Sequence, residues 1–480
     1  MGLGWVLALA ALGCGPGRAS TGEGGQDTQE STSEVGESSD AGSSSETSVE
    51  TSGETETGEP PPCPPGGCLD GGGPPPQGPC PWGQCVALDV VFVIDGSSSM
   101  AEEQLNLAAQ YPQMIDQLRT VFDDDGDPLP TDVHLMVMPV VGLNPLCPQD
   151  EEPGFRPLWQ PQTDPCTERL EDFVLEGEGE AQSFEQACEL SCPDPVAPLD
   201  PYIAFNSEGS NVPGDAVEQA FGCLAPQGVA SCDYGSILET MLQALNPGAE
   251  WNSGPDPFLR EGAALVIVVI ADEPDCSLRL PEGAELFLSL DTYWPLDPET
   301  GTKPGPTQAT CWSTGVHCGE PDPDGVYADC DAVDTGVLFG LERYSNYLRG
   351  ELIDSLNKEV VMLGVLGVPP VTAHGSDLPN FPIEGGVSEL VYRQWQDGPW
   401  PAGDMLPGSM TDAATKQYEL GIGPGCTEID EMGEVIGQGL PPVRVRELCE
   451  GLNADDRLRC CIESICDPDL SQLFNCVGPF

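Results

Sequence analysis

The sequence predicts an α/β fold with a doubly wound, mostly parallel sheet and long disulfide-rich insertions. Unbroken runs of β-branched and other apolar residues recur along the chain, as in strands buried on both faces of a parallel sheet. Segments with helical periodicity separate these runs, as in successive βαβ units. The 480 residues include 58 Gly, 50 Pro and 21 Cys, which indicates long loops between these elements.

The expected elements alternate between strand and helix from residue 87 onward. The first strand, 87–94, leads into a helix in which Leu105, Ala108, Ile115, Leu118 and Phe122 recur at helical spacing, with a kink expected at Pro112. Residues 143–232 are rich in Pro and Cys and show no clear period, so they are expected to form an insertion. The other expected elements are a strand at 131–142, a helix at 234–245, a strand at 263–271, a helix at 337–356 and a strand at 360–368.

The first 14 residues have the pattern of a bacterial lipoprotein signal peptide. A short apolar segment ends in Gly13 and Cys14, which resemble the cleavage point and the lipidated cysteine of a lipobox. An ordinary signal peptide with an incidental cysteine is the alternative. The resemblance implies a membrane anchor through the lipid on Cys14, and localisation to the bacterial cell envelope as an outer-membrane lipoprotein, periplasmic or surface-facing, or secretion.

Two further segments precede the expected fold. Residues 15–62 consist mainly of Ser, Thr, Glu and Gly, which cannot bury enough apolar surface to offset chain entropy, so a disordered tether is expected. Residues 63–86 form a Cys-, Pro- and Gly-rich linker with four cysteines in two matching steps. Two small disulfide loops are favoured there over a zinc site, because C-x-x-C spacing and histidine are missing.

The charge balance restricts the classes of partner. The chain carries 80 acidic and 16 basic residues, a formal net charge of −64. This balance argues against nucleic acids and anionic membrane surfaces as partners, because phosphate binding needs clustered Lys or Arg. Divalent cations and basic partners fit this charge better, although acids that merely keep a secreted protein soluble are the simpler explanation for most of them.

The sequence DVVFVIDGSSSM ends a buried strand with an acid and a run of serines. In open α/β sheets ligands bind at the carboxyl ends of the strands, so Asp95, Ser97 and Ser99 are expected to project together from one loop. Their oxygens are hard ligands, which suit Mg²⁺, Mn²⁺ or Ca²⁺. The alternative is that these residues only cap the following helix.

This stretch resembles the D-x-S-x-S motif of von Willebrand factor A-type (VWA) domains. Other stretches, among them LERYSNYLRG, PPVRVRELCE and CCIESICDPDL, look like a subfamily of bacterial secreted lipoproteins that carry one such domain. The resemblance covers most of residues 87–480. It implies a VWA or Rossmann-like fold there, with Cys-rich insertions and a Cys-rich C-terminal segment.

In that family the motif carries a metal-ion-dependent adhesion site (MIDAS), completed by an aspartate after the fourth strand. The resemblance implies Mg²⁺ as the cation, with Mn²⁺ or Ca²⁺ as alternatives, and a macromolecular or peptide partner whose carboxylate fills the open coordination position. The implied metal ligands are Asp95, Ser97, Ser99 and Asp272.

One expected ligand departs from the family pattern. The family usually supplies a threonine before the third helix, where this chain has Val229 in the stretch QGVASCDYG, with Ser231 as the nearest hydroxyl. A site without this threonine is expected to bind its cation more weakly.

Catalytic motifs are missing from the sequence. Neither G-x-S-x-G nor H-E-x-x-H occurs, and the three histidines lie far apart, so we expect a binding protein rather than an enzyme. A structural envelope protein with a vestigial metal site is one alternative. A metal-dependent hydrolase is the other, and Glu273 and Asp275 are its candidate general bases.

The cysteines are expected to be oxidised. Twenty remain after Cys14, an even number for an oxidising compartment. Short separations favour the local pairs Cys63–Cys68, Cys80–Cys85 and Cys223–Cys232. The adjacent Cys460 and Cys461 are expected to pair with two different partners.

We predict that Cys14 is acylated and begins the mature chain. Because Gly15 places no acid at the second mature position, the lipoprotein should follow the usual route to the outer membrane. Intact-mass measurement of the membrane-extracted protein checks this prediction, and an unmodified mature terminus away from Cys14 would contradict it.

Overall fold

The computed structural model describes most of the chain after residue 85. The lipidation site Cys14, the tether 15–62 and nearly all of the linker 63–86 lie outside the described residues, as do the expected pairs Cys63–Cys68 and Cys80–Cys85. The described residues are 86–122, 127–143, 159–175, 181–288, 291–375, 381–430, 432–453 and 457–476.

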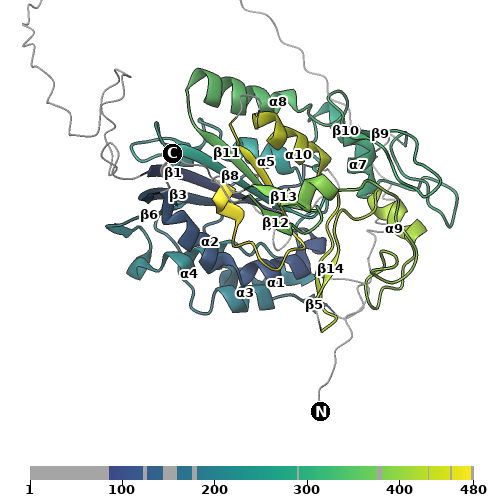
Figure 1. Ribbon diagram of the computed structural model, residues 1–480, viewed down its shortest axis with the longest axis horizontal. Helices are drawn as coiled ribbons and strands as arrows, with labels where there is room; N and C mark the ends of the chain where they lie inside the picture. The colour runs from purple at the N-terminus through teal and green to yellow at the C-terminus, as the bar shows by residue number, and fades with distance from the viewer. Residues whose placement is uncertain are drawn as a thin grey trace, which may run out of the picture. The chain divides into compact units, whose positions relative to one another are not determined.

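A mostly parallel sheet of eight strands forms the centre of the described residues (Figure 1). The order β16-β11-β8-β1-β3 is parallel throughout, and β6 and β2 pair with β3 in the antiparallel sense. The predicted α/β class with a mostly parallel sheet is therefore confirmed. These strands are β1 (Val86–Ile94), β2 (Thr120–Phe122), β3 (Pro128–Pro139), β6 (Ile203–Asn206), β7 (Gly209–Ser210), β8 (Ala264–Ala271), β11 (Val360–Leu366) and β16 (Cys460–Ser464).

The side chains of β1 alternate between the two faces of the sheet, and both faces are buried. Val90 and Phe92 belong to one hydrophobic cluster, whereas Val91 and Val93 belong to another. A strand covered on both sides favours apolar residues on both faces, which is why the sequence is an unbroken apolar run from Val90 to Ile94.

Helices cover both faces of this sheet (Figure 1). Helices α1, α2 and α4 pack in the cluster of Phe92, and α5, α8 and α10 in the cluster of Val91. The helices are α1 (Ala101–Ala108), α2 (Tyr111–Leu118), α3 (Gln186–Ser191), α4 (Val217–Leu224), α5 (Ile237–Ala244), α6 (Glu285–Leu288), α7 (Ala309–Gly315), α8 (Glu342–Ser345), continued by a π-helical segment (Asn346–Ser355), α9 (Ala413–Leu420) and α10 (Val443–Glu450).

The expected helix after Ser99 is divided into two. The break falls at residues 109–110, and Pro112 stands at the second position of α2, where its missing amide hydrogen costs nothing. Phe122 lies in strand β2 rather than in the helix. No helix within the described ranges has both the length and the apolarity needed to cross a bilayer.

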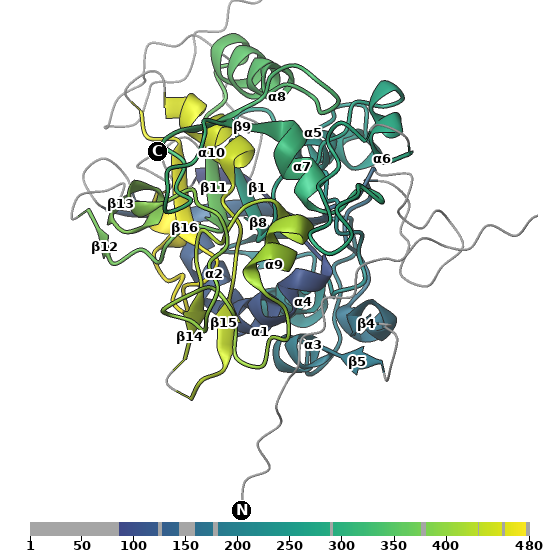
Figure 2. The same cartoon turned by 90° about the vertical axis from the view of Figure 1, so that its right-hand side faces the viewer.

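Further two-stranded sheets lie outside the central sheet. Figure 2 looks onto the side where α7 and α9 lie in front of the central strands. These short strands are β4 (Val174–Leu175), β5 (Gln182–Ser183), β9 (Val316–Cys318), β10 (Cys330–Ala332), β12 (Ala373–His374), β13 (Pro382–Glu384), β14 (Glu428–Ile429) and β15 (Val435–Gly437).

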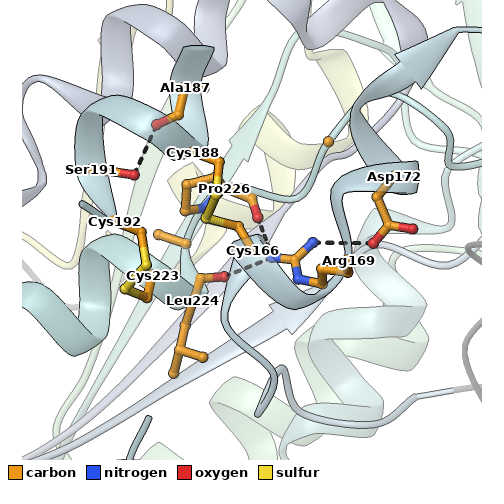
Figure 3. Close-up of a disulfide and its surroundings, with 12 residues drawn as sticks. Cys166, Arg169, Asp172, Ala187, Cys188, Ser191, Cys192, Cys223, Leu224 and Pro226 are labelled. Atoms are coloured by element: carbon orange, nitrogen blue, oxygen red, sulfur yellow. Dashed lines mark hydrogen bonds and ion pairs between the residues drawn. A yellow bond between two sulfur atoms is a disulfide. The ribbon is translucent and has the colours of Figure 1, made fainter. Parts of the chain in front are cut away.

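The insertion at 143–232 is folded where it is described, and two disulfides tie it together (Figure 3). Cys166 pairs with Cys188, and Cys192 pairs with Cys223. The expected pair Cys223–Cys232 is therefore wrong. Cys223 lies on α4, which packs beside α3, so the tertiary neighbour Cys192 takes precedence over a cysteine that is near in sequence.

All cysteines with described side chains are disulfide-bonded, including Cys232 and Cys461. As expected, Cys460 does not pair with its neighbour Cys461, and its partner is Cys449 on α10. The remaining described pairs are Cys276–Cys311, Cys318–Cys330 and Cys426–Cys466.

A buried ion pair attaches α10 to the loop that follows β8. Arg444 Nε lies 2.9 Å from Asp275 Oδ2, and both side chains are almost completely buried. The other oxygen of Asp275 accepts hydrogen bonds from the Leu238 amide, at 2.9 Å, and from the Ser277 hydroxyl, at 2.6 Å. The carboxylate therefore joins α10, the start of α5 and the loop after β8.

We predict that Arg444→Met lowers the free energy of unfolding by about 3–5 kcal/mol, because it leaves the buried charge of Asp275 without its counter-ion. Arg457→Met is the matched control. Arg457 also lies 2.8 Å from a carboxylate, that of Glu359, but its side chain is 57% exposed, so the change should stay below about 1 kcal/mol. Equilibrium denaturation with urea measures both values, and equal losses would contradict the prediction.

Candidate metal centre

The two predicted acidic ligands lie at the same edge of the sheet. Asp95 follows β1 and Asp272 follows β8, and these strands are parallel neighbours in the register Ile94↔Ile270. The Asp95 amide donates to the Ile270 carbonyl at 2.9 Å, which extends the ladder to the acid itself. Asp95 is 1% exposed and Asp272 is 2% exposed, so this pairing brings two carboxyl groups together out of contact with bulk water.

The two predicted hydroxyl ligands stand beside these acids. The Ser97 amide donates to Asp95 Oδ1 at 3.0 Å, which fixes the turn after β1. The hydroxyl oxygens of Ser97 and Ser99 lie 3.1 Å apart. Neither Ser97, at the start of the turn Ser98–Met100, nor Met100, at the start of α1, caps its helix with a side chain. If these residues only capped the next helix, such capping hydrogen bonds would be expected, but neither position has one.

Two carboxylate oxygens of the site are buried without a hydrogen-bond partner. These atoms are Asp95 Oδ2 and Asp272 Oδ1, for which the described structure supplies no donor. Buried polar atoms are nearly always paired, so each exception needs a physical explanation. A cation between the two oxygens would satisfy both.

The carboxyl groups of the site disfavour one another's charge. Burial raises the pKa of Asp95 to about 6, although the hydrogen bond from Ser97 acts to lower it. Burial and then the nearby Asp95 charge raise the pKa of Asp272 well above its ordinary value. For Glu273 the causes of the raised pKa are burial and then Asp272. The site therefore favours protons or a cation over three bare carboxylates.

The loop 226–235 reaches the site, with Val229 at the position where the resemblance implies a threonine. Val229 is 2% exposed, and its amide donates to the Asp172 carbonyl at 2.7 Å, so its side chain belongs to the interior. The Ser231 amide donates to the Gly96 carbonyl at 3.1 Å, which brings the backbone of Ser231 beside the D-x-S-x-S loop.

The same loop brings in Asp233, a residue that the sequence pattern did not single out. Its Oδ1 accepts hydrogen bonds from the Ser98 hydroxyl at 3.1 Å and from the Ser98 amide at 3.4 Å. Burial raises its pKa. In the sequence, the only indication of Asp233 is its position two residues after Ser231. The folded loop is needed to show that its carboxylate faces Ser98 in the D-x-S-x-S loop.

The disulfide-tied insertion holds this loop in place (Figure 3). The Arg169 guanidinium lies 3.2 Å from Asp172 and donates to the carbonyls of Leu224 and Pro226. Gly228 has φ +86°, and an added Cβ would lie 2.2 Å from the Asp172 carbonyl oxygen. The loop therefore needs glycine at this position.

The two candidate general bases differ in their surroundings. The Asp275 carboxylate accepts hydrogen bonds from Arg444, Ser277 and the Leu238 amide, so its role is structural. Glu273 is 5% exposed, and its Oε1 accepts hydrogen bonds from Ser99 Oγ at 2.7 Å and from Gln308 Nε2 at 2.6 Å.

Glu103 on α1 is a second acid that the sequence pattern did not single out. It is 2% exposed, and its Oε1 accepts a hydrogen bond from the Gln438 amide at 2.9 Å. Burial, followed by the charge of Asp272, raises its pKa well above the ordinary value. The Leu440 amide donates to the Asp272 carbonyl at 2.7 Å, so the segment 437–440 borders the site at two points.

Within the described residues, His, Cys, Asp and Glu side chains form no group of three or more that could hold a metal ion. The ligand set implied by the sequence has two carboxylates and two serine hydroxyls. Because serine is not counted in such a group, this set contributes only two members to it. Comparisons with models of protein families and with curated proteins find no match to this chain.

We predict that, without divalent cations, Asp95→Asn becomes more stable relative to the wild type as the pH rises from 4 to 7. The pKa of Asp95 is about 6 in the folded protein and 3.8 in the unfolded chain. The folded state therefore holds the Asp95 proton more tightly, and the stability that this provides is complete below pH 3.8 and is lost as the pH rises to about 6. The gain of the variant should reach about 3 kcal/mol, because a tenfold difference in proton affinity between the folded and unfolded states corresponds to roughly 1.4 kcal/mol.

Urea denaturation of both proteins in excess chelator, at several pH values, measures this difference. A difference that stays constant across the range would show that Asp95 ionises as easily in the folded protein as in the unfolded chain.

Proposed function

We propose that this chain is an envelope-anchored VWA-domain protein that binds a protein or peptide ligand through a divalent cation at a MIDAS. The residues that would hold the cation are Asp95, Ser97, Ser99 and Asp272. The observation that carries the proposal is the pair of buried carboxylate oxygens, Asp95 Oδ2 and Asp272 Oδ1, for which the described residues offer no donor.

The donor set fits a hard cation. Carboxylate and hydroxyl oxygens are the ligands that Mg²⁺, Mn²⁺ and Ca²⁺ prefer. With two carboxylates and two hydroxyls, the protein would leave part of the coordination shell of Mg²⁺ to water or to a partner. The chemistry that the cation would supply is the attraction of an anionic group, here a carboxylate of the ligand.

The architecture supports the resemblance to VWA domains. Asp272 follows β8, the strand directly beside β1, as the resemblance requires of the acid that completes the site. The anchoring part of the proposal rests on the sequence around Cys14 and on the composition of residues 15–62. The net charge of −64 supports a cation-mediated contact and disfavours nucleic acid.

One observation favours a second candidate, a structural envelope protein with a vestigial site. Val229, at the position of the usual threonine, is buried and has no oxygen on its side chain. The same loop, however, places the Asp233 carboxylate against the serine turn. A metal-dependent hydrolase has less support, because Asp275 is tied up in its ion pair.

Calorimetric titration of the full chain with Mg²⁺, Mn²⁺ and Ca²⁺ tests the cation site. We expect one cation per chain for the wild type and loss of that binding in Asp95→Asn, which keeps the acceptor for the Ser97 amide but removes the charge. Asp354→Asn, the same change at an exposed position, should bind as the wild type does. A wild-type chain that binds none of the three cations would contradict the proposal.

The ligand part of the proposal has its own test. Peptides selected from a random library on the Mg²⁺-loaded chain should share an Asp or Glu, and excess chelator should release them. Changing that acid to its amide should abolish binding. Peptides that stay bound in chelator, or that bind Asp95→Asn equally well, would show that the cation does not mediate the contact.

A further inference from the structure

Ser99 connects the candidate metal centre to a part of the chain far from it in sequence. Its hydroxyl oxygen lies 3.1 Å from that of Ser97 and 2.7 Å from Glu273 Oε1. The same Glu273 oxygen accepts a hydrogen bond from Gln308 Nε2 at 2.6 Å. Gln308 is the residue that directly precedes α7.

The direction of the hydrogen bonds follows from the number of protons. A serine hydroxyl has one proton and two acceptor lone pairs. Because Ser99 donates its proton to Glu273, Ser97 must be the donor in the contact between the two serines. Each serine then keeps a lone pair for another contact.

Gln308 is held in place by covalent and hydrogen-bonded contacts. A disulfide joins Cys311 on α7 to Cys276, three residues after Glu273. The Gln308 side chain also reaches the Asp233 carbonyl at 3.5 Å, so it joins the loops that follow α4 and β8. Thr310 and Cys311 are buried, which leaves α7 little room to move away from the site.

We propose that Glu273 is a positioning residue for the cation site, and that Gln308, directly before α7, holds it there. Glu273 takes the hydroxyl proton of Ser99, so that the oxygens of Ser97 and Ser99 present lone pairs rather than protons to the cation. This inference rests on the proposed function. It makes α7 and its disulfide part of the cation site, although the D-x-S-x-S motif gives no sign of them.

The test is calorimetric titration of the full chain with MnCl₂. Glu273→Met removes the acceptor of the Ser99 proton and should weaken Mn²⁺ binding at least tenfold, as loss of an outer-shell partner of a metal ligand commonly does. Glu273→Gln keeps an acceptor oxygen for both Ser99 and Gln308, so its affinity should stay within about threefold of the wild type. Gln308→Met should weaken binding in the same direction as Glu273→Met.

Two controls separate positioning from other roles. Glu102→Gln removes a charge from α1 next to Glu103 without touching Ser99, and it should leave Mn²⁺ affinity unchanged. The cation-free urea midpoint of each variant shows whether the fold is intact, and that of Glu273→Gln should be no lower than the wild-type midpoint, because its amide removes a buried charge.

The outcomes distinguish the inference from the proposed function. Absence of Mn²⁺ binding to the wild type would contradict the proposed function and the inference with it. Wild-type binding that Glu273→Met leaves unchanged would overturn the inference alone. If Glu273→Gln binds as weakly as Glu273→Met, Glu273 acts through its charge, and the positioning role is likewise overturned.

Discussion

The parallel pairing of β1 with β8 is the constraint on which the candidate site depends. It places Asp95 and Asp272 at neighbouring strand ends, where both are buried and the described part of the chain offers no donor to two of their oxygens. Such an arrangement is unfavourable for two bare carboxylates, because burial and their mutual repulsion both disfavour the charged forms. The strands cannot relieve this repulsion by a shift in register, since such a shift would move apolar side chains of both faces out of their hydrophobic clusters.

Much of the remaining chain supports this strand edge from outside the sheet. Disulfides and the buried Arg169 hold the loop that carries Val229 and Asp233, and a further disulfide holds α7 with Gln308. On α1, Gln104 Oε1 accepts hydrogen bonds from the Gln227 and Gly228 amides at 2.8 and 2.9 Å. Such links reduce the number of conformations open to a loop.

The sequence was most informative where local pattern and burial agree. Strand β8, apolar at every position, and the run Val90–Ile94 of β1 were predictable, and so was the meeting of Asp95 and Asp272 at one edge. Strand β16 was not, because Cys460, Cys461, Glu463 and Ser464 do not form an apolar run; the parallel edge of β11 defines it. The sequence around β6 is equally short and mixed, and β3 gives it an antiparallel partner.

The misses at the site have a common physical origin. Loop closure alone favours Cys232 as the partner of Cys223, whereas the packing of α3 against α4 brings Cys192 to it. Asp233 and Gln308 lie far from Asp95 in sequence, as Glu103 does from Asp272, and no spacing rule relates them. Long-range contacts of this kind arise from tertiary packing, which a single sequence does not display.

The most direct test of the cation site is anomalous diffraction from crystals of the chain grown with Mn²⁺. We expect one manganese peak at coordination distance from Asp95, between the carboxyl end of β1 and that of β8. A manganese peak elsewhere on the chain, or none at this strand edge at saturating Mn²⁺, would contradict the proposed site.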